Sequence, residues 1–244
     1  MSGHSKFSKI KHQKGSADQK RGVLFSKLSK NITAAARAGG DPTANFKLRL
    51  IMDKARSAGM TKETIDRAIA KGSGTDKSET ILIEETYEGF GPAKTAYIVE
   101  VIADNKNRIY QELRRAFSDH GGILGNSGSV NWQFEHRGVI HLASSLRDGA
   151  PSLSDEQLEL KLIDAGADDI VQNEDETIVY TKLADLKQVE ENIRAQGIKI
   201  EYAGLEWVAK ETINPDEELQ AKLEAFENAL DSLEDVSEYY NNIL

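Results

Sequence analysis

The chain is 244 residues long, which suffices for one large domain or for two to three small ones. It contains no cysteine, which excludes disulfides, thiol nucleophiles and cysteine-based zinc sites. It also lacks a run of about 18 apolar residues and an apolar N-terminal leader, so we expect a cytoplasmic protein without a membrane segment. The net charge of −9 conceals an asymmetry: residues 1–80 hold 17 Lys and Arg against 7 Asp and Glu, whereas residues 81–244 hold 14 against 33. This segregation suggests a polyanion-binding end joined to an acidic body.

The N-terminal third is predicted to be an arm followed by three helices. Residues 1–16 show no hydrophobic period, and we expect an arm that is mobile until a partner binds. A helix is predicted over residues 18–38, because its apolar side chains fall on one arc at 100° per residue. The four cations Lys20, Lys27, Lys30 and Arg37 lie on a different face of this helix. Two shorter amphipathic helices follow, the last one capped by Thr61.

Strands dominate the pattern after residue 79. Strands are predicted over residues 80–87 and 95–103, on either side of a turn at 88–92. A helix near 108–120 follows, then a glycine-rich stretch and a strand over 129–135. The polar run 104–108 is interpreted as a loop that caps this helix through Asp104 or Asn105; the alternative is a polar site at a domain junction.

Residues 138–208 show the element order of a ferredoxin-like βαββαβ unit. Its strands are predicted at 139–143, 169–173, 177–181 and 199–202, with helices at 154–165 and 183–196. A tail then adds a strand at 207–213, a capped helix and a short strand at 236–240. Because this tail supplies the helix and strand that residues 79–135 lack, we infer an insertion. The predicted class is α+β, with a basic arm and helical domain over 1–78, a discontinuous α/β domain of 79–137 and 209–244, and an inserted ferredoxin-like domain over 138–208.

A search for catalytic motifs finds none. The five histidines include no pair at i, i+4, and neither a P-loop nor a nucleophile elbow occurs. Tyr87–Gly91 faintly resembles an RNA-recognition strand, but Pro92 follows at once and favours a tight turn. We therefore expect a non-enzymatic protein with no catalytic residue, no metal, no cofactor and no small-molecule substrate.

The basic N-terminal region is the candidate binding site. Its lysines would neutralise phosphates and release counterions, and Phe7 between them would stack on an unpaired base, which favours RNA or single strands. The alternative is that Phe7 and Ile10 dock onto the helical domain as ordinary core. The candidate nucleic-acid-binding residues are Lys6, Phe7, Lys9, Lys11, His12, Lys14, Lys20, Arg21, Lys27, Lys30 and Arg37.

Several ordered motifs resemble those of the YebC family. They are Gly3-His4-Ser5-Lys6-Phe7, Ile10-Lys11-His12, Lys20-Arg21, Leu48-Arg49-Leu50, Tyr87-Glu88-Gly89-Phe90-Gly91-Pro92, Asp104-Asn105-Lys106-Asn107-Arg108, Ala116-Phe117, Gly121-Gly122, Ser127-Gly128-Ser129-Val130, and the stretch from Leu230 to Val236 with Tyr240. The resemblance covers nearly the whole chain. It implies a helical domain followed by two α/β domains, the third inserted in the second. It also implies a regulator of transcription, while a mitochondrial branch activates translation of cytochrome oxidase and bacterial relatives are tied to ribosome function at proline-rich stretches.

The chain departs from the family pattern at a few positions. Phe7 stands where the family commonly has Trp, and Gln13 removes one cation from the arm. Phe46 replaces a frequent Pro, and Ala93-Lys94 replaces a frequent Gly-Gly. The last change puts in doubt any role that needs a close backbone approach at that loop.

Two functions remain open at this point. The first is a nucleic-acid-binding regulator whose partner is DNA or RNA, including ribosomal RNA and the ribosome. Of these two partners, DNA bound in a sequence-specific way has less support, because no helix carries the set of Arg, Asn and Gln residues that reads base edges. The alternative is a protein-interaction adaptor that uses an acidic cleft between the two α/β domains.

Overall fold

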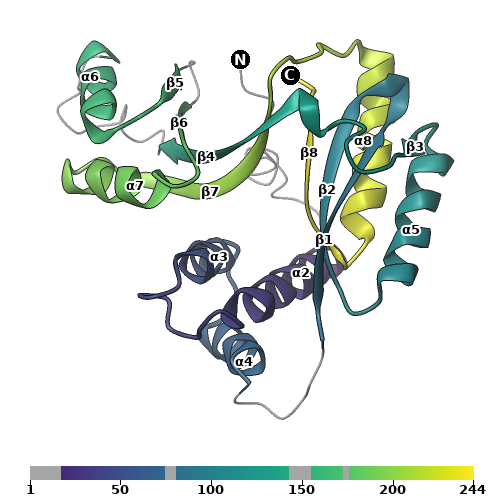
Figure 1. The fold of residues 1–244 in the computed structure, drawn as a ribbon, viewed down its shortest axis with the longest axis horizontal. Coiled ribbons are helices and arrows are strands. Elements are labelled where there is room, and N and C mark those ends of the chain that lie inside the picture. The colour runs from purple at the N-terminus through teal and green to yellow at the C-terminus, as the bar shows by residue number, and fades with distance from the viewer. Residues whose placement is uncertain (1–17, 75–80, 143–154, 173–175) are drawn as a thin grey trace. The chain divides into compact units, whose positions relative to one another are not determined.

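The computed structural model describes residues 18–74, 81–142, 155–172 and 176–244 (Figure 1). They divide into two compact units, one built from the described part of 135–208 and the other from the described residues before 135 and after 208. No helix in the described part of the chain is long and apolar enough to cross a membrane.

Three helices form a small domain at the start of the larger unit, as predicted. They are α2 (Asp18–Ala36), α3 (Phe46–Ser57) and α4 (Lys62–Gly72). Asn45 and Thr61 cap α3 and α4, each accepting a backbone hydrogen bond through its side chain. Their apolar stripes meet in one core, composed of Leu28, Ile32, Ala35, Ala36, Leu48, Met52, Ala55, Met60, Ile65 and Ala68.

A four-stranded sheet follows in the same unit, with the order β3-β1-β2-β8. Its strands are β1 (Ile83–Phe90), β2 (Ala96–Ala103), β3 (Ile123–Leu124) and β8 (Val236–Asn241). A turn connects β1 to β2, but it begins later than the predicted 88–92, because β1 continues through Phe90; the turn contains the 3-10 turn η1 (Pro92–Lys94). Helices α5 (Lys106–Asp119) and α8 (Glu217–Ser232) cover one face of this sheet (Figure 1).

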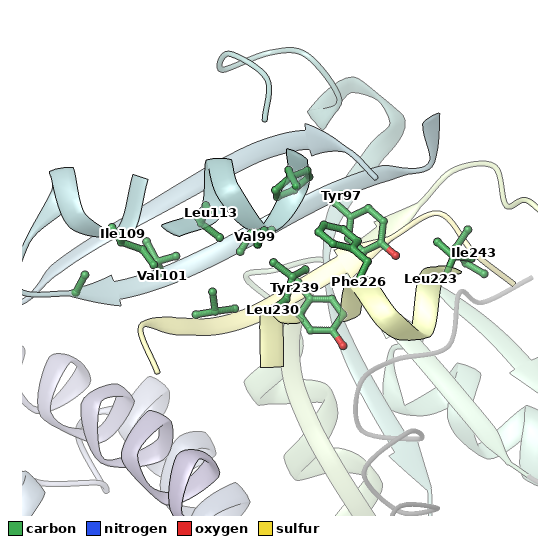
Figure 2. Packing of buried hydrophobic residues seen from close by; sticks show 14 residues of the cluster. Tyr97, Val99, Val101, Ile109, Leu113, Leu223, Phe226, Leu230, Tyr239 and Ile243 are labelled. Atoms are coloured by element: carbon green, nitrogen blue, oxygen red, sulfur yellow. The ribbon is translucent and has the colours of Figure 1, made fainter. Parts of the chain in front are cut away.

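Aromatic side chains fill the core between that face and the two helices (Figure 2). The Phe226 ring meets Tyr97 at 4.9 Å and Phe117 at 4.8 Å between centroids, both edge to face. Because side chains alternate along a strand, the odd-numbered residues of β2 point into this core and the even-numbered ones point to the opposite face.

The smaller unit has the predicted βαββαβ order. Its elements are β4 (Phe134–Leu142), α6 (Asp155–Ala165), β5 (Asp169–Gln172), β6 (Thr177–Thr181), α7 (Leu186–Ala195) and β7 (Ile200–Ala209). Its sheet order, β5-β6-β4-β7, is that of a ferredoxin-like fold. The predicted α+β class is confirmed: the described residues form a helical domain and two sheets, each with helices packed on it.

Two strand predictions are wrong in detail. The expected strand at 199–202 and the first part of the one expected at 207–213 form a single strand, β7, which runs through Gly204 and ends at Ala209. A Cβ at position 204 would lie 2.1 Å from the Tyr202 hydroxyl oxygen, so glycine here permits that ring to lie across the strand. Most of the expected strand at 129–135 is instead a loop with a 3-10 turn, η2 (Asn131–Gln133), and the backbone amides at the start of this turn bond to a side chain of β1. The last two residues of the expected strand begin β4.

Candidate nucleic-acid interface

The first turns of α2 present two of the predicted cations to solvent. Lys20 and Arg21 are exposed. The Arg21 guanidinium lies 5.2 Å from the centroid of the Phe25 ring, one turn along the same helix. This contact orients the cation at the surface of the helical domain, where a phosphate has access to it.

The remaining predicted cations of α2 face the rest of the unit. Lys27 is only 5% exposed; its Nζ lies 3.5 Å from the Leu230 carbonyl oxygen and 4.0 Å from Asp231. Lys30 bonds to Asp235 at 2.5 Å. Arg37 donates to the Leu82 carbonyl oxygen, just before β1. The four cations do lie apart from the helical core, as predicted, but three of them contact the α/β part of the unit.

Asp235 is the centre of this contact. Its side chain is 4% exposed and accepts hydrogen bonds from Lys30 and from Arg108 of α5. Burial raises the pKa of Asp235, but the hydrogen bonds and charges of its two partners outweigh burial and hold the pKa below 3.8. The ionised carboxylate therefore joins α2 to α5 at the turn between α8 and β8.

The helical domain makes two further charged contacts with the sheet. Lys47 bonds to Glu84 at 2.6 Å, and Lys54 bonds to Glu238. Exposed cations also occur on α4, at Lys62, Arg67 and Lys71. The positive charge of residues 18–74 thus divides between an exposed set and a set that holds the domain against acidic strands.

The arm residues of the predicted site, Lys6, Phe7, Lys9, Lys11, His12 and Lys14, lie outside the described residues. The predicted cap of α5 is confirmed: the Asn105 side chain accepts hydrogen bonds from the backbone amides of Asn107 and Arg108. Asn105 also positions Arg108 beside Asp235, so the polar run 104–108 is a cap that adjoins a contact between domains.

A second polar feature, on β1, escaped the sequence-based search. Glu88 is 6% exposed, and its carboxylate accepts hydrogen bonds from the backbone amides of Gly128, Val130 and Asn131 at 2.7–2.8 Å. Burial raises the pKa of Glu88, but the three hydrogen bonds together lower it by more than burial raises it. The pKa of Glu88 is therefore below its usual value. Two features of the sequence pointed to this contact. One is the glutamate flanked by tyrosine, glycine and phenylalanine near the end of a strand, and the other is the glycine-rich segment that could bring backbone amides to it.

Comparison with known proteins assigns both parts of the chain to one family. Residues 5–75 match the TACO1/YebC protein N-terminal domain, and residues 82–243 match the TACO1/YebC second and third domain. A "Probable transcriptional regulatory protein" of Herpetosiphon aurantiacus is 40% identical over 244 residues, covering 100% of this chain and 94% of that protein. The transcriptional regulatory protein PmpR of Pseudomonas aeruginosa is 42% identical over 244 residues, covering 99% of this chain and 95% of that one.

A solved structure agrees with these matches. The crystal structure of a conserved hypothetical protein from Aquifex aeolicus is 38% identical and superposes with a TM-score of 0.81, covering 96% of this chain and 95% of that one. Sequence and fold therefore agree over nearly the full length, and the chain belongs to the TACO1/YebC family.

Proposed function

We propose that this chain is a non-enzymatic, cytoplasmic regulator of gene expression that binds nucleic acid through its basic N-terminal region. The observation that carries the proposal is the segregation of charge, with 17 cations against 7 acids in residues 1–80 and 14 against 33 in the remainder. A polyanion is attracted by the net charge of the first region, whereas the net charge of the second opposes its approach. The names of two relatives, a "Probable transcriptional regulatory protein" and the transcriptional regulatory protein PmpR, support the same role.

The contacts on α2 refine which residues bind. Lys20 and Arg21 are exposed, and with the arm residues they form the phosphate-binding set. Lys27, Lys30 and Arg37 already bond to Leu230, Asp235 and Leu82, so they would reach a phosphate only if those contacts broke. In the refined proposal these three hold the helical domain in place.

Binding is tested by its salt dependence. We expect log K for a short RNA to fall steeply with log salt between about 0.05 and 0.2 M, because each phosphate contact releases counterions. Replacing Lys6, Lys9, Lys11 and Lys14 by Ala lowers the slope by about 3 to 4. The matched control replaces four lysines of the acidic part, Lys182, Lys187, Lys199 and Lys222, and leaves the slope unchanged.

A salt-independent affinity, or an equal effect of both quadruple variants, contradicts the proposal. The template is then identified by sedimentation of a lysate on sucrose gradients at low and high salt. Salt-sensitive comigration with ribosomes assigns the protein to translation. Binding to duplex DNA without comigration assigns it to transcription.

A further inference from the structure

The sheet of the larger unit carries two different attachments on the face opposite α5 and α8. Ile98, Glu100 and Ile102 point to this face, because they alternate with the core residues of β2. At one end the helical domain packs, with Ala34 against Leu82 and Ile102. At the other end Glu88, which pairs in register with Ile98, holds the 125–133 loop. The loop therefore lies on the same face of the sheet as the basic helical domain.

The backbone of the 125–133 loop is fixed from several sides. Besides the three bonds to the Glu88 carboxylate, the Gly125 amide bonds to the Glu88 carbonyl oxygen at 2.8 Å. Lys210 donates to the Trp132 carbonyl oxygen at 2.9 Å. Within the loop, the Val130 side chain is fully buried. A buried carboxylate with three amide partners is a costly way to fix a surface loop, which indicates that the position of the loop matters.

The loop presents a large aromatic ring to solvent. Trp132 is 66% exposed, although a tryptophan ring is ordinarily much more buried. Its indole N–H already donates to the Ser129 carbonyl oxygen at 3.2 Å, so the ring is held in one orientation. What remains for a partner is the ring face, and a preorganised face loses little entropy on binding.

The surroundings of the ring are polar and cationic. Asn126, Ser127, Gly128 and Asn131 are exposed in the same loop, and the Lys210 ammonium lies next to the Trp132 backbone. These amide and hydroxyl groups disfavour an apolar protein surface as the partner, because it could not form hydrogen bonds with them. The flat base and the phosphate of an unpaired nucleotide match both the ring and the ammonium.

We infer that Trp132 is a stacking contact for an unpaired base of a single-stranded nucleic acid, with Lys210 beside it as a phosphate contact. This inference rests on the proposed function and adds to it a preference for single strands. Glu88 acts as a positioning residue, because its carboxylate holds the backbone that leads into Trp132, at Gly128, Val130 and Asn131.

The test uses the full chain and its two tryptophans. The Trp207 ring is stacked on His136 at 4.5 Å between centroids, so one of its faces is already covered. A short uridine oligonucleotide should quench the fluorescence of the unchanged chain, and Trp132→Phe should remove most of that quenching. Trp207→Phe is the matched control and should retain it. The thermal melt of Trp132→Phe should be unchanged, because the ring is exposed.

Affinity gives the second readout. Trp132→Ala should weaken binding of the uridine oligonucleotide by roughly 5- to 150-fold, which corresponds to the stacking of one base. Binding of a duplex of equal length should change by less than about two-fold, because phosphate contacts remain. If Trp132→Ala binds the single strand as tightly as the unchanged chain, the inference is overturned while the proposed function stands. If the unchanged chain binds neither nucleic acid, both are overturned.

Discussion

The two ends of α2 carry the same kind of charge and use it differently. At the first turns Lys20 and Arg21 are exposed, whereas from Lys27 onward the cations contact the turn between α8 and β8 and the segment before β1. The difference arises from the neighbours, because Asp231 in the last turn of α8 and Glu234 and Asp235 just after it lie beside Lys27 and Lys30. The charge of a helix face alone therefore does not show whether its cations bind a nucleic acid or an acidic group of the same chain.

An intramolecular acid and a nucleic-acid phosphate offer similar chemistry to a lysine. A carboxylate fixed beside Lys30 is present at high effective concentration, so it outcompetes a phosphate from solution. Exposed Lys20 and Arg21 face no such competitor among the described contacts. We therefore expect stability and nucleic-acid affinity to depend on different residues of one helix.

The largest effect should follow from removal of the central acid. Asp235→Ala leaves Lys30 and Arg108 without their shared carboxylate, and we expect the free energy of unfolding to fall by about 2–3 kcal/mol. This cost is smaller than for a fully buried ion pair, because both cations are partly exposed. Urea unfolding measures this. Asp119→Ala, which removes an exposed pair with Arg115, serves as the control and should cost less than about 0.5 kcal/mol. Equal costs would mean that the contact does not hold the domain.

The same contact should depend on pH. The pKa of Asp235 is lower in the folded chain than the value of 3.8 expected when unfolded, so folding favours the ionised form. Its contribution is complete above pH 3.8 and is lost as the pH falls through the folded value. The difference in the free energy of unfolding between the unchanged chain and Asp235→Asn should therefore become smaller as the pH falls below 3.8. A difference that stays constant would show that the charge contributes nothing.

A smaller effect is expected from an uncharged bond at the same contact. The Ser237 hydroxyl donates to the Asn31 side-chain oxygen at 2.7 Å, and Asn31 is 8% exposed. Ser237→Ala should lower the free energy of unfolding by about 1 kcal/mol and leave the affinity for RNA unchanged. A loss of affinity without a loss of stability would place this contact in the binding surface instead.

The fold was largely predictable because its signals are local. The stripe of α2, the caps at Thr61 and Asn105 and the βαββαβ order all follow from short-range patterns. The larger errors fell at β7, where the chain runs straight through Gly204, and at the 125–133 loop, where the distant Glu88 side chain decides the backbone. No local pattern shows that the Tyr202 ring lies over Gly204 or that Glu88 binds the loop.

The candidate site was less predictable for the same reason. Helical spacing placed Lys20, Lys27, Lys30 and Arg37 together, but the acids beside Lys27 and Lys30 come from about 200 residues later in the chain. Arg37 donates to a backbone carbonyl oxygen, that of Leu82. Trp132 was included in a predicted strand, and its exposure follows from the loop that replaces that strand. Both features depend on contacts distant in sequence.

The most direct test compares two variants of α2 by affinity for a single-stranded RNA and by urea unfolding. The Lys20→Ala, Arg21→Ala double variant should lose affinity by about 10- to 30-fold at 0.15 M salt, which corresponds to two phosphate contacts, and keep its stability. Lys30→Ala should lose about 1–2 kcal/mol of stability and keep its affinity. The opposite assignment, with affinity lost in Lys30→Ala and retained in the double variant, would contradict the division of α2 into a binding end and a holding end.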